Sequence, residues 1–314
     1  MDLLERIRGT GLLPEGGQFV VLLSGGRDSV CLLDVAARIT SEAGVLALHV
    51  NYGLRDGADA DEAACRSLCA RLRVQLEVER VTRPDGAGNM QAWARDVRYG
   101  AGAQLAEHRD ALLLAGHTAT DQAETVLYRL ASSPSRRALL GMTLKEGRLV
   151  RPLLGVTREQ TAAHCLARGL GWVEDPTNDT DAYARGRVRT GLVPALEAVH
   201  PAAQRNIVRA SQLLREEAEV LDEVVDTALA GRDHVALHHL RILPPALGRL
   251  VLRRLAEDAV GSLCPRVSAR FEEVCELADH AMLDLGDGVR AVVRKGTLRF
   301  ERTPPLGERA PIPH

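Results

Sequence analysis

The chain has few aromatic residues and almost no lysine. Phenylalanine, tyrosine and tryptophan make up 3% of its 314 residues, so leucine, valine and alanine must fill any core. Lys145 and Lys295 are the only lysines among 40 basic residues. A coding bias towards arginine explains this most simply, although arginine also suits bidentate contacts to phosphate. The net charge of −2 gives no overall signal for nucleic-acid binding.

Long apolar runs and closely paired cysteines are also absent. No apolar stretch approaches the ~20 residues of a membrane span, and residues 1–6 lack the basic and apolar regions of a signal peptide. These absences predict a cytoplasmic protein that has no membrane partner. None of the six cysteines forms a C-x-x-C pair, so buried thiols are expected rather than zinc ligands or disulfides.

Short apolar runs alternate with helical patterns in the first half of the chain. The runs that predict strands lie at 19–23, 45–50, 74–79 and 111–115. The segments with helical spacing lie at 30–39, 59–73, 90–107 and 121–131. This alternation predicts an α/β fold with a doubly wound, mostly parallel sheet, whose ligand binds beyond the carboxyl ends of the strands.

The pattern changes after Pro176. Helical spacing covers 192–230, with a break at His200-Pro201. The segments that follow predict a strand at 234–240, helices near 244–258 and 265–279, and a hairpin or edge strand over 289–301. We therefore expect one domain over 1–215, then a linker helix and a small α+β domain with a loose tail over 216–314.

The hexapeptide Ser24-Gly25-Gly26-Arg27-Asp28-Ser29 occupies the first strand-to-helix turn. Backbone N–H groups and the helix dipole at such a turn favour a phosphate. A carboxylate at position 28 repels phosphate unless a metal bridges the two, so the turn suggests a nucleotide held with Mg²⁺. An ordinary glycine turn capped by serines is the alternative. The sequence is neither a Walker A motif nor a G-x-G-x-x-G fingerprint.

Two histidines also lie at predicted strand ends. His49 ends the second strand, where a histidine with a purely structural role is the alternative. His117 follows the strand at 111–115 and precedes Thr120 and Asp121. We expect Thr120 to cap the next helix, with Asp121 in its first turn. Capping explains these two residues but does not explain why His117 and Glu124 share the neighbourhood.

Arginines form two further groups. Arg95 and Arg98 share one helical face, from which they would reach phosphates unless the face is merely solvated. Arg187 and Arg189 belong to three arginines at alternate positions over 185–189, which suits a loop or short strand. The basic stretch from there to residue 215 is either a footprint for RNA or a solvated face.

Seven blocks, in this order and spacing, resemble the tRNA(Ile)-lysidine synthetases, which are N-type ATP pyrophosphatases with a PP-loop. The blocks lie at 24–29, 49–55, 94–99, 121–125, 151–154, 172–178 and 183–189. The resemblance is strong over roughly the first 215 residues, and the length looks like the family's short form with one C-terminal domain. Thr118 and Thr120 stand where the family usually has His and Asp, and 185–189 has Arg-Gly-Arg-Val-Arg in place of Arg-Asn-Arg-Ile-Arg.

The resemblance implies a ligase that uses ATP and Mg²⁺ to adenylate C2 of the wobble cytidine of CAU-anticodon tRNA(Ile). The ε-amine of free L-lysine then attacks, giving lysidine, AMP and pyrophosphate. The implied ATP-binding residues are Ser24, Gly25, Gly26, Arg27, Asp28, Ser29, His49, Arg95 and Arg98. The implied catalytic residues are Asp28, His117, Asp121, Arg187 and Arg189, with Asp28 and Asp121 as metal ligands.

The resemblance also assigns catalysis to 1–215 and tRNA binding to 216–314, and it leaves a homodimer open. Glu174 and Asp175 could attract the lysine cation, although a turn before Pro176 explains them equally well. Two other functions share the loop. A tRNA thiolase normally needs paired cysteines, which this chain lacks. A degenerate, non-catalytic nucleotide-binding protein is suggested by Thr118 and Thr120, and pyrophosphate turnover would distinguish it from an enzyme.

Overall fold

The chain divides into two compact units, Met1–Gln212 and Leu213–His314. The computed structural model describes residues 2–54, 57–84, 88–133, 135–174 and 184–304. Within these ranges, no helix combines the length and the apolar character that crossing a membrane requires.

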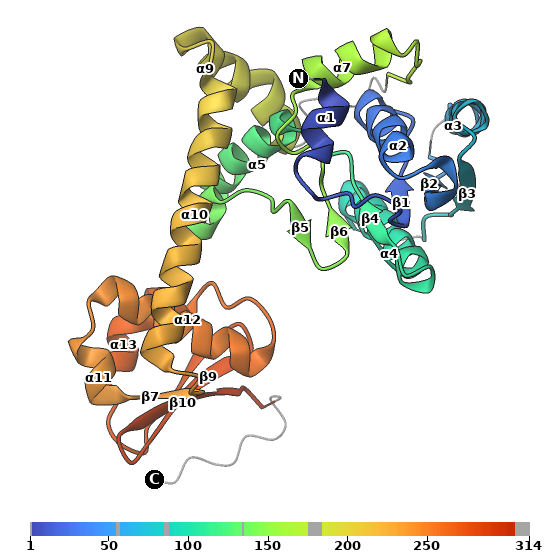
Figure 1. The fold of residues 1–314 in the computed structure, drawn as a ribbon. Helices are drawn as coiled ribbons and strands as arrows, with labels where there is room; N and C mark the ends of the chain where they lie inside the picture. The colour runs from blue at the N-terminus through green and yellow to red at the C-terminus, as the bar shows by residue number, and fades with distance from the viewer. Residues whose placement is uncertain (1, 55–56, 85–87, 134, 175–183, 305–314) are drawn as a thin grey trace. The chain divides into compact units, whose positions relative to one another are not determined.

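A six-stranded sheet forms the centre of the first unit (Figure 1). Its strand order is β3-β2-β1-β4-β6-β5, and all neighbouring strands pair in parallel except β5 with β6. The strands are β1 (Phe19–Leu22), β2 (Val45–Asn51), β3 (Gln75–Arg80), β4 (Leu112–Leu114), β5 (Lys145–Glu146) and β6 (Leu149–Val150). The predicted doubly wound, mostly parallel sheet is confirmed.

Helices cover both faces of this sheet because neighbouring side chains on a strand point in opposite directions. Val21 of β1 packs in one core with α2 (Arg27–Ile39) and α3 (Ala58–Leu72). Val20, the preceding residue, packs in the opposite core with α4 (Met90–His108). The first core also holds α1 (Leu3–Arg8) and α7 (Arg158–Ala167), and a short 3₁₀ turn, Glu42–Gly44, precedes β2.

Residues 184–192 are helical, whereas the alternating arginines at 185–189 predict a loop or short strand. The helix α8 (Ala184–Arg187) passes into a π-helical turn (Val188–Leu192) and then into α9 (Val193–Val199). Val188 and Val193 bury their side chains against Leu127, and this apolar contact decides the conformation over the alternating arginines. The predicted break follows at His200-Pro201, after which α10 (Ala203–Leu229) begins.

The remaining helices of the first unit follow β4 and precede β5. They are α5 (Ala119–Ser132) and α6 (Arg136–Leu139). Val208 of α10 packs against Ala119 and Ala123 of α5. The start of α10 therefore belongs to the core of the first unit.

The second unit contains a four-stranded sheet of order β7-β10-β9-β8, whose neighbouring strands pair antiparallel. Its elements are β7 (His234–Ala236), α11 (Leu237–Ile242), α12 (Pro245–Val260), a 3₁₀ turn (Val267–Arg270), α13 (Phe271–Cys275), β8 (Met282–Gly286), β9 (Val289–Arg294) and β10 (Thr297–Arg302). The predicted α+β character and the hairpin over 289–301 are confirmed.

Two predictions for the second unit were wrong in detail. The strand over 234–240 ends at Ala236, because Leu237 and Leu240 enter the core at helical spacing. The helix near 265–279 is a 3₁₀ turn followed by α13, which ends at Cys275. β8 was not predicted.

Candidate active site

The first half of the hexapeptide, up to Gly26, forms the turn between β1 and α2, and its second half begins α2. Gly25 has a φ of 84°, a conformation that favours glycine. The Ser29 hydroxyl donates to the Gly26 carbonyl oxygen at 2.8 Å and accepts from the Ser24 backbone N–H at 3.2 Å. The two serine hydroxyl oxygens lie 3.1 Å apart. The serines therefore brace the turn from within, and the α2 N-terminus, which begins at Arg27, follows directly.

Gly116, just beyond β4, allows a close backbone approach to this turn. A Cβ at position 116 would lie 3.2 Å from the carbonyl carbon and oxygen of Asp28 and from the backbone nitrogen of Ser29. These are backbone atoms on a helix N-terminus, so they have little room to yield.

We expect Gly116→Ala to displace the turn. The change should cost about 1–3 kcal/mol of unfolding free energy through overpacking and weaken ATP binding, as measured by urea unfolding and calorimetric titration. Gly100→Ala in α4 is the matched control, because a Cβ there meets no atom within 4 Å. The control should be neutral or stabilising by up to about 1 kcal/mol. Wild-type stability and ATP affinity in Gly116→Ala would contradict the expectation.

Asp28 lies at the start of α2 and contacts residues of α7. Its carboxylate accepts a short hydrogen bond from the Thr161 hydroxyl and lies 3.3 Å from Nε of Arg27. Nε of Arg158 is 3.7 Å from the second carboxylate oxygen. Asp28 therefore faces cationic and hydroxyl groups and keeps a partly exposed side chain.

Thr118, rather than the predicted Thr120, caps α5. The Thr118 backbone N–H and hydroxyl each donate to Oδ2 of Asp121 at 2.8 Å. The Asp121 backbone N–H donates in return to the Thr118 hydroxyl oxygen at 3.4 Å, which completes a capping box. Oδ1 of Asp121 lies 3.2 Å from Nη2 of Arg158. Burial alone would raise the pKa of Asp121, but the Arg158 guanidinium and the Thr118 hydrogen bonds outweigh it and hold this pKa below its usual range.

Glu124, one turn further along α5, forms a buried ion pair with Arg189. Nε of Arg189 lies 2.7 Å from one carboxylate oxygen and Nη2 lies 2.9 Å from the other. Only 5% of the Glu124 side chain is exposed. Arg158 approaches the same carboxylate at 3.9 Å, and Arg189 approaches Asp121 at 3.9 Å. Three carboxylates and two guanidinium groups thus form one cluster.

His117 lies against Tyr99 of α4. The two rings are nearly parallel, with centroids 6.5 Å apart, and the Tyr99 hydroxyl is 3.5 Å from Nε2 of His117. The guanidinium groups of Arg95 and Arg98 lie 4.7 and 5.6 Å from the Tyr99 ring centroid. Nδ1 of His117 is buried without a hydrogen-bond partner among the described residues, so it is the ring atom with unused capacity to bind a substrate.

Burial, together with the nearby Arg95, Arg151 and Arg98, lowers the pKa of His117 to about 4, against an opposing contribution from Asp121. The imidazole is therefore neutral near pH 7. A neutral histidine can accept a proton or a hydrogen bond, which a permanently protonated one cannot.

This lowered pKa predicts a pH dependence of stability that His117→Gln removes. Between pH 6.5 and pH 4 the unfolded chain binds a proton at this histidine and the folded chain does not, so stability falls as the pH falls. From pH 7.5 to pH 5 the wild type should lose about 2 kcal/mol more than His117→Gln. Urea unfolding of both proteins at the two pH values measures this, and parallel losses would refute it.

The other predicted residues are placed as follows. His49 is buried in β2, and its Nδ1 lies 2.9 Å from the Leu23 carbonyl oxygen, so the structural alternative has support. Arg187 is exposed in α8. Glu174 is exposed, and the Val173 backbone N–H donates to the Gly25 carbonyl oxygen at 2.9 Å. Asp175 and residues 176–178 lie outside the described residues. Arg158, Thr161 and Glu124 were missing from the predicted site.

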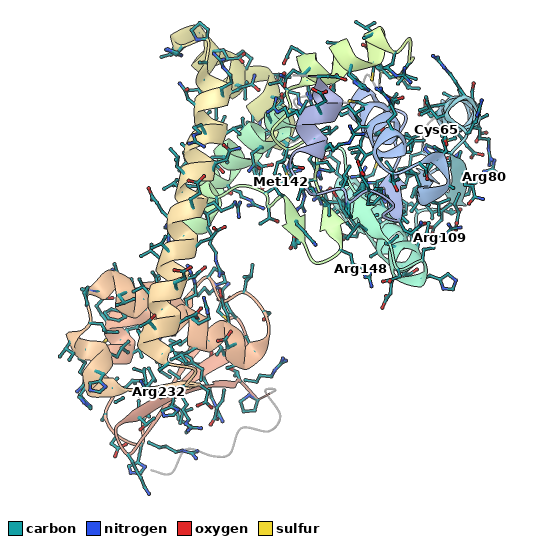
Figure 2. All side chains as sticks on the ribbon, in the orientation of Figure 1. Cys65, Arg80, Arg109, Met142, Arg148 and Arg232 are labelled. Carbon is teal, nitrogen blue, oxygen red and sulfur yellow. The ribbon has the colours of Figure 1, made fainter. Side chains whose placement is uncertain are left out.

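All the cysteines belong to the described residues, and five of the six are buried, as expected. Cys65 and Cys69 share the inner face of α3, which packs on the sheet; Figure 2 labels Cys65 there. Among the residues that the structure describes, no group of three or more histidine, cysteine, aspartate and glutamate side chains is arranged to hold a metal ion.

The sheet, the glycine turn and the carboxylates beside it define the class: residues 5–196 match the PP-loop domain family. A tRNA(Ile)-lysidine synthase of Pseudomonas fluorescens is 39% identical over 67% of this chain and 48% of its own length. One from Salinispora tropica is 40% identical over 78% of each chain. The chain belongs to the tRNA(Ile)-lysidine synthase family, and it spans about half the length of the Pseudomonas relative.

A solved structure supports the fold independently. The U34-tRNA thiolase from Methanococcus maripaludis, determined with its 4Fe-4S cluster, superposes with a TM-score of 0.56 over 68% of this chain and 78% of its own. The two sequences are 19% identical, so this similarity concerns the fold alone.

Proposed function

We propose that the protein is a tRNA(Ile)-lysidine synthase. It adenylates C2 of the wobble cytidine in CAU-anticodon tRNA(Ile) with ATP and then joins that carbon to the ε-amine of free lysine. AMP and pyrophosphate are released. The proposal rests on one observation: segments far apart in the sequence, the PP-loop, α5, α7 and the turn at Arg189, converge on one cluster of charged side chains.

The PP-loop supports the ATP half of the reaction. Gly26, which is half-buried, precedes the α2 N-terminus, where backbone N–H groups and the helix dipole attract phosphate. Arg95 and Arg98 add positive charge beside His117. Pyrophosphate would leave from the PP-loop side of the site. Its departure requires neutralisation of phosphate charge more than a nucleophilic side chain.

The residues present fit Mg²⁺ bound together with a nucleotide. Mg²⁺ prefers oxygen ligands and usually takes one or two carboxylates together with phosphate oxygens and water. Asp28 and Asp121 meet this requirement, because their carboxylates lie close enough together for one cationic group, the Arg158 guanidinium, to contact both. When bound, Mg²⁺ would neutralise charge on the phosphates.

The α5 side supports the lysine half. Asp121 and Glu124 place two carboxylates on one face of a helix, and such a pair attracts an ammonium group. His117 is neutral and has a free Nδ1, so it can orient a substrate oxygen or take a proton from the attacking amine. The same proposal assigns tRNA binding to the basic stretch over 185–215 and to the second unit.

The cysteines disfavour a thiolase. A thiolase of the kind that shares this fold was solved with an iron–sulfur cluster, whereas the described residues here include no comparable ligand set. A non-catalytic role is disfavoured because Thr118, which replaces the family's usual histidine, positions Asp121 rather than disabling it.

The test is incorporation of labelled lysine into tRNA by the purified chain. Transcripts of tRNA(Ile) with the CAU anticodon should take up lysine with equimolar AMP and pyrophosphate, and transcripts with GAU at the anticodon should not. Absence of lysine uptake and of pyrophosphate release would refute the proposal. Sulfur incorporation would identify a thiolase instead.

A further inference from the structure

Arg158, the first residue of α7, contacts carboxylates on two other helices. Its Nε lies 3.7 Å from Asp28 of α2, its Nη2 lies 3.2 Å from Asp121 of α5, and its Nη1 lies 3.9 Å from Glu124 of α5. Each of its three nitrogens therefore faces a different carboxylate. The guanidinium is planar and stays charged at any working pH, so it holds these three groups in a fixed relative arrangement.

The helix that carries Arg158 is firmly attached to α2. Thr161 donates to Asp28, and Nε2 of His164 lies 2.8 Å from the buried carboxylate of Asp34. Arg168 lies 3.4 Å from the same carboxylate. A capping box formed by Thr157 and Gln160 begins the helix directly around Arg158. These contacts fix the backbone of α7 at Arg158, and with it the place from which the guanidinium reaches the three carboxylates.

We propose that Arg158 is a positioning residue that sets the distance between the nucleotide half of the site, at Asp28, and the amine half, at Asp121 and Glu124. This inference rests on the proposed function, which places the nucleotide at Asp28 and the lysine amine at Asp121 and Glu124, with Asp121 also beside the Mg²⁺ that accompanies the nucleotide. Arg27 still pairs with Asp28, and Arg189 still pairs with Glu124, when Arg158 is removed. What is lost is the one cation that contacts both Asp28 and the α5 carboxylates, so the distance between the two halves is no longer fixed. A displacement of about 1 Å is enough to cost 10²-fold in rate.

The experiment compares Arg158→Gln and Arg158→Lys in the full chain. For Arg158→Gln we expect KM to rise about tenfold or more for both ATP and lysine, together with a lower kcat. Equilibrium binding of a fluorescent ATP analogue, measured without tRNA or lysine, should weaken in parallel. Arg158→Lys should partly restore the KM for ATP or for lysine but not both. A single ammonium group cannot reach three carboxylates in the guanidinium geometry.

Arg148→Gln is the matched control. Arg148, which Figure 2 labels, lies in the turn between β5 and β6. Its Nη2 lies 2.7 Å from the Asp110 carboxylate. The Arg148→Gln change removes the same charge as Arg158→Gln but from a surface ion pair, so the KM values for ATP and lysine should stay unchanged.

The outcomes separate the two proposals. Wild-type chain that incorporates no lysine overturns the proposed function and this inference with it. Active wild type together with an Arg158→Gln protein whose kcat falls while both KM values hold assigns Arg158 a merely structural role. An increase in only one KM also overturns the inference, because the residue would then serve one half of the site alone.

Discussion

Asp28→Asn is expected to reduce AMP and pyrophosphate formation by about 10²–10³-fold. The amide has the size of the carboxylate and can still accept the Thr161 hydrogen bond, so the turn should keep its shape. What is lost is the negative charge beside Arg158 and the oxygen ligand that we assign to Mg²⁺. Pyrophosphate release with saturating tRNA and lysine measures the effect, and the half-saturating Mg²⁺ concentration should rise.

Asp110→Asn provides the matched control for this change. Asp110 pairs with Arg148 and its side chain is 88% exposed, so the same loss of charge occurs at the surface. The control should retain wild-type turnover. Asp28→Asn turnover within twofold of that control would remove Asp28 from the catalytic site.

The parallel sheet could be predicted because its central strands β1 and β2 are buried on both faces. Val20 and Val21 of β1 enter opposite cores, so the strand appears in the sequence as a continuous apolar run rather than an alternating one. Glycines after β1 and polar residues after β4 then marked the strand ends. This pattern is local, and local patterns are what a single sequence displays.

Contacts between distant segments could not be predicted in the same way. Arg158 belongs to the site because α7 packs along α2, which brings residue 158 to residue 28. The cap of α5 was assigned to Thr120 although Thr118-x-x-Asp121 has the spacing of a capping box, which was the available signal. The alternating arginines at 185–189 suggested extended chain, but burial of Val188 favoured a helix.

The ion pair between Glu124 and Arg189 offers a second large effect, in which stability and activity can be separated. Arg189→Met leaves a carboxylate that is 5% exposed without its bidentate partner. We expect a loss of about 3 kcal/mol in unfolding free energy, measured by urea unfolding, together with loss of lysine incorporation. The cost is high because Arg158, at 3.9 Å, compensates Glu124 only partly.

The double variant Glu124→Leu with Arg189→Met tests where that cost arises. Replacing both partners with apolar side chains removes the uncompensated charge, so most of the lost stability should return. Lysine incorporation should not return, because the carboxylate that we assign to the ammonium group is gone. A double variant that regains both would show that the pair is structural and that the lysine site lies elsewhere. Regained stability without lysine incorporation would separate two roles of this ion pair. Arg189 would then neutralise the buried charge of Glu124, and Glu124 would also bind the lysine substrate.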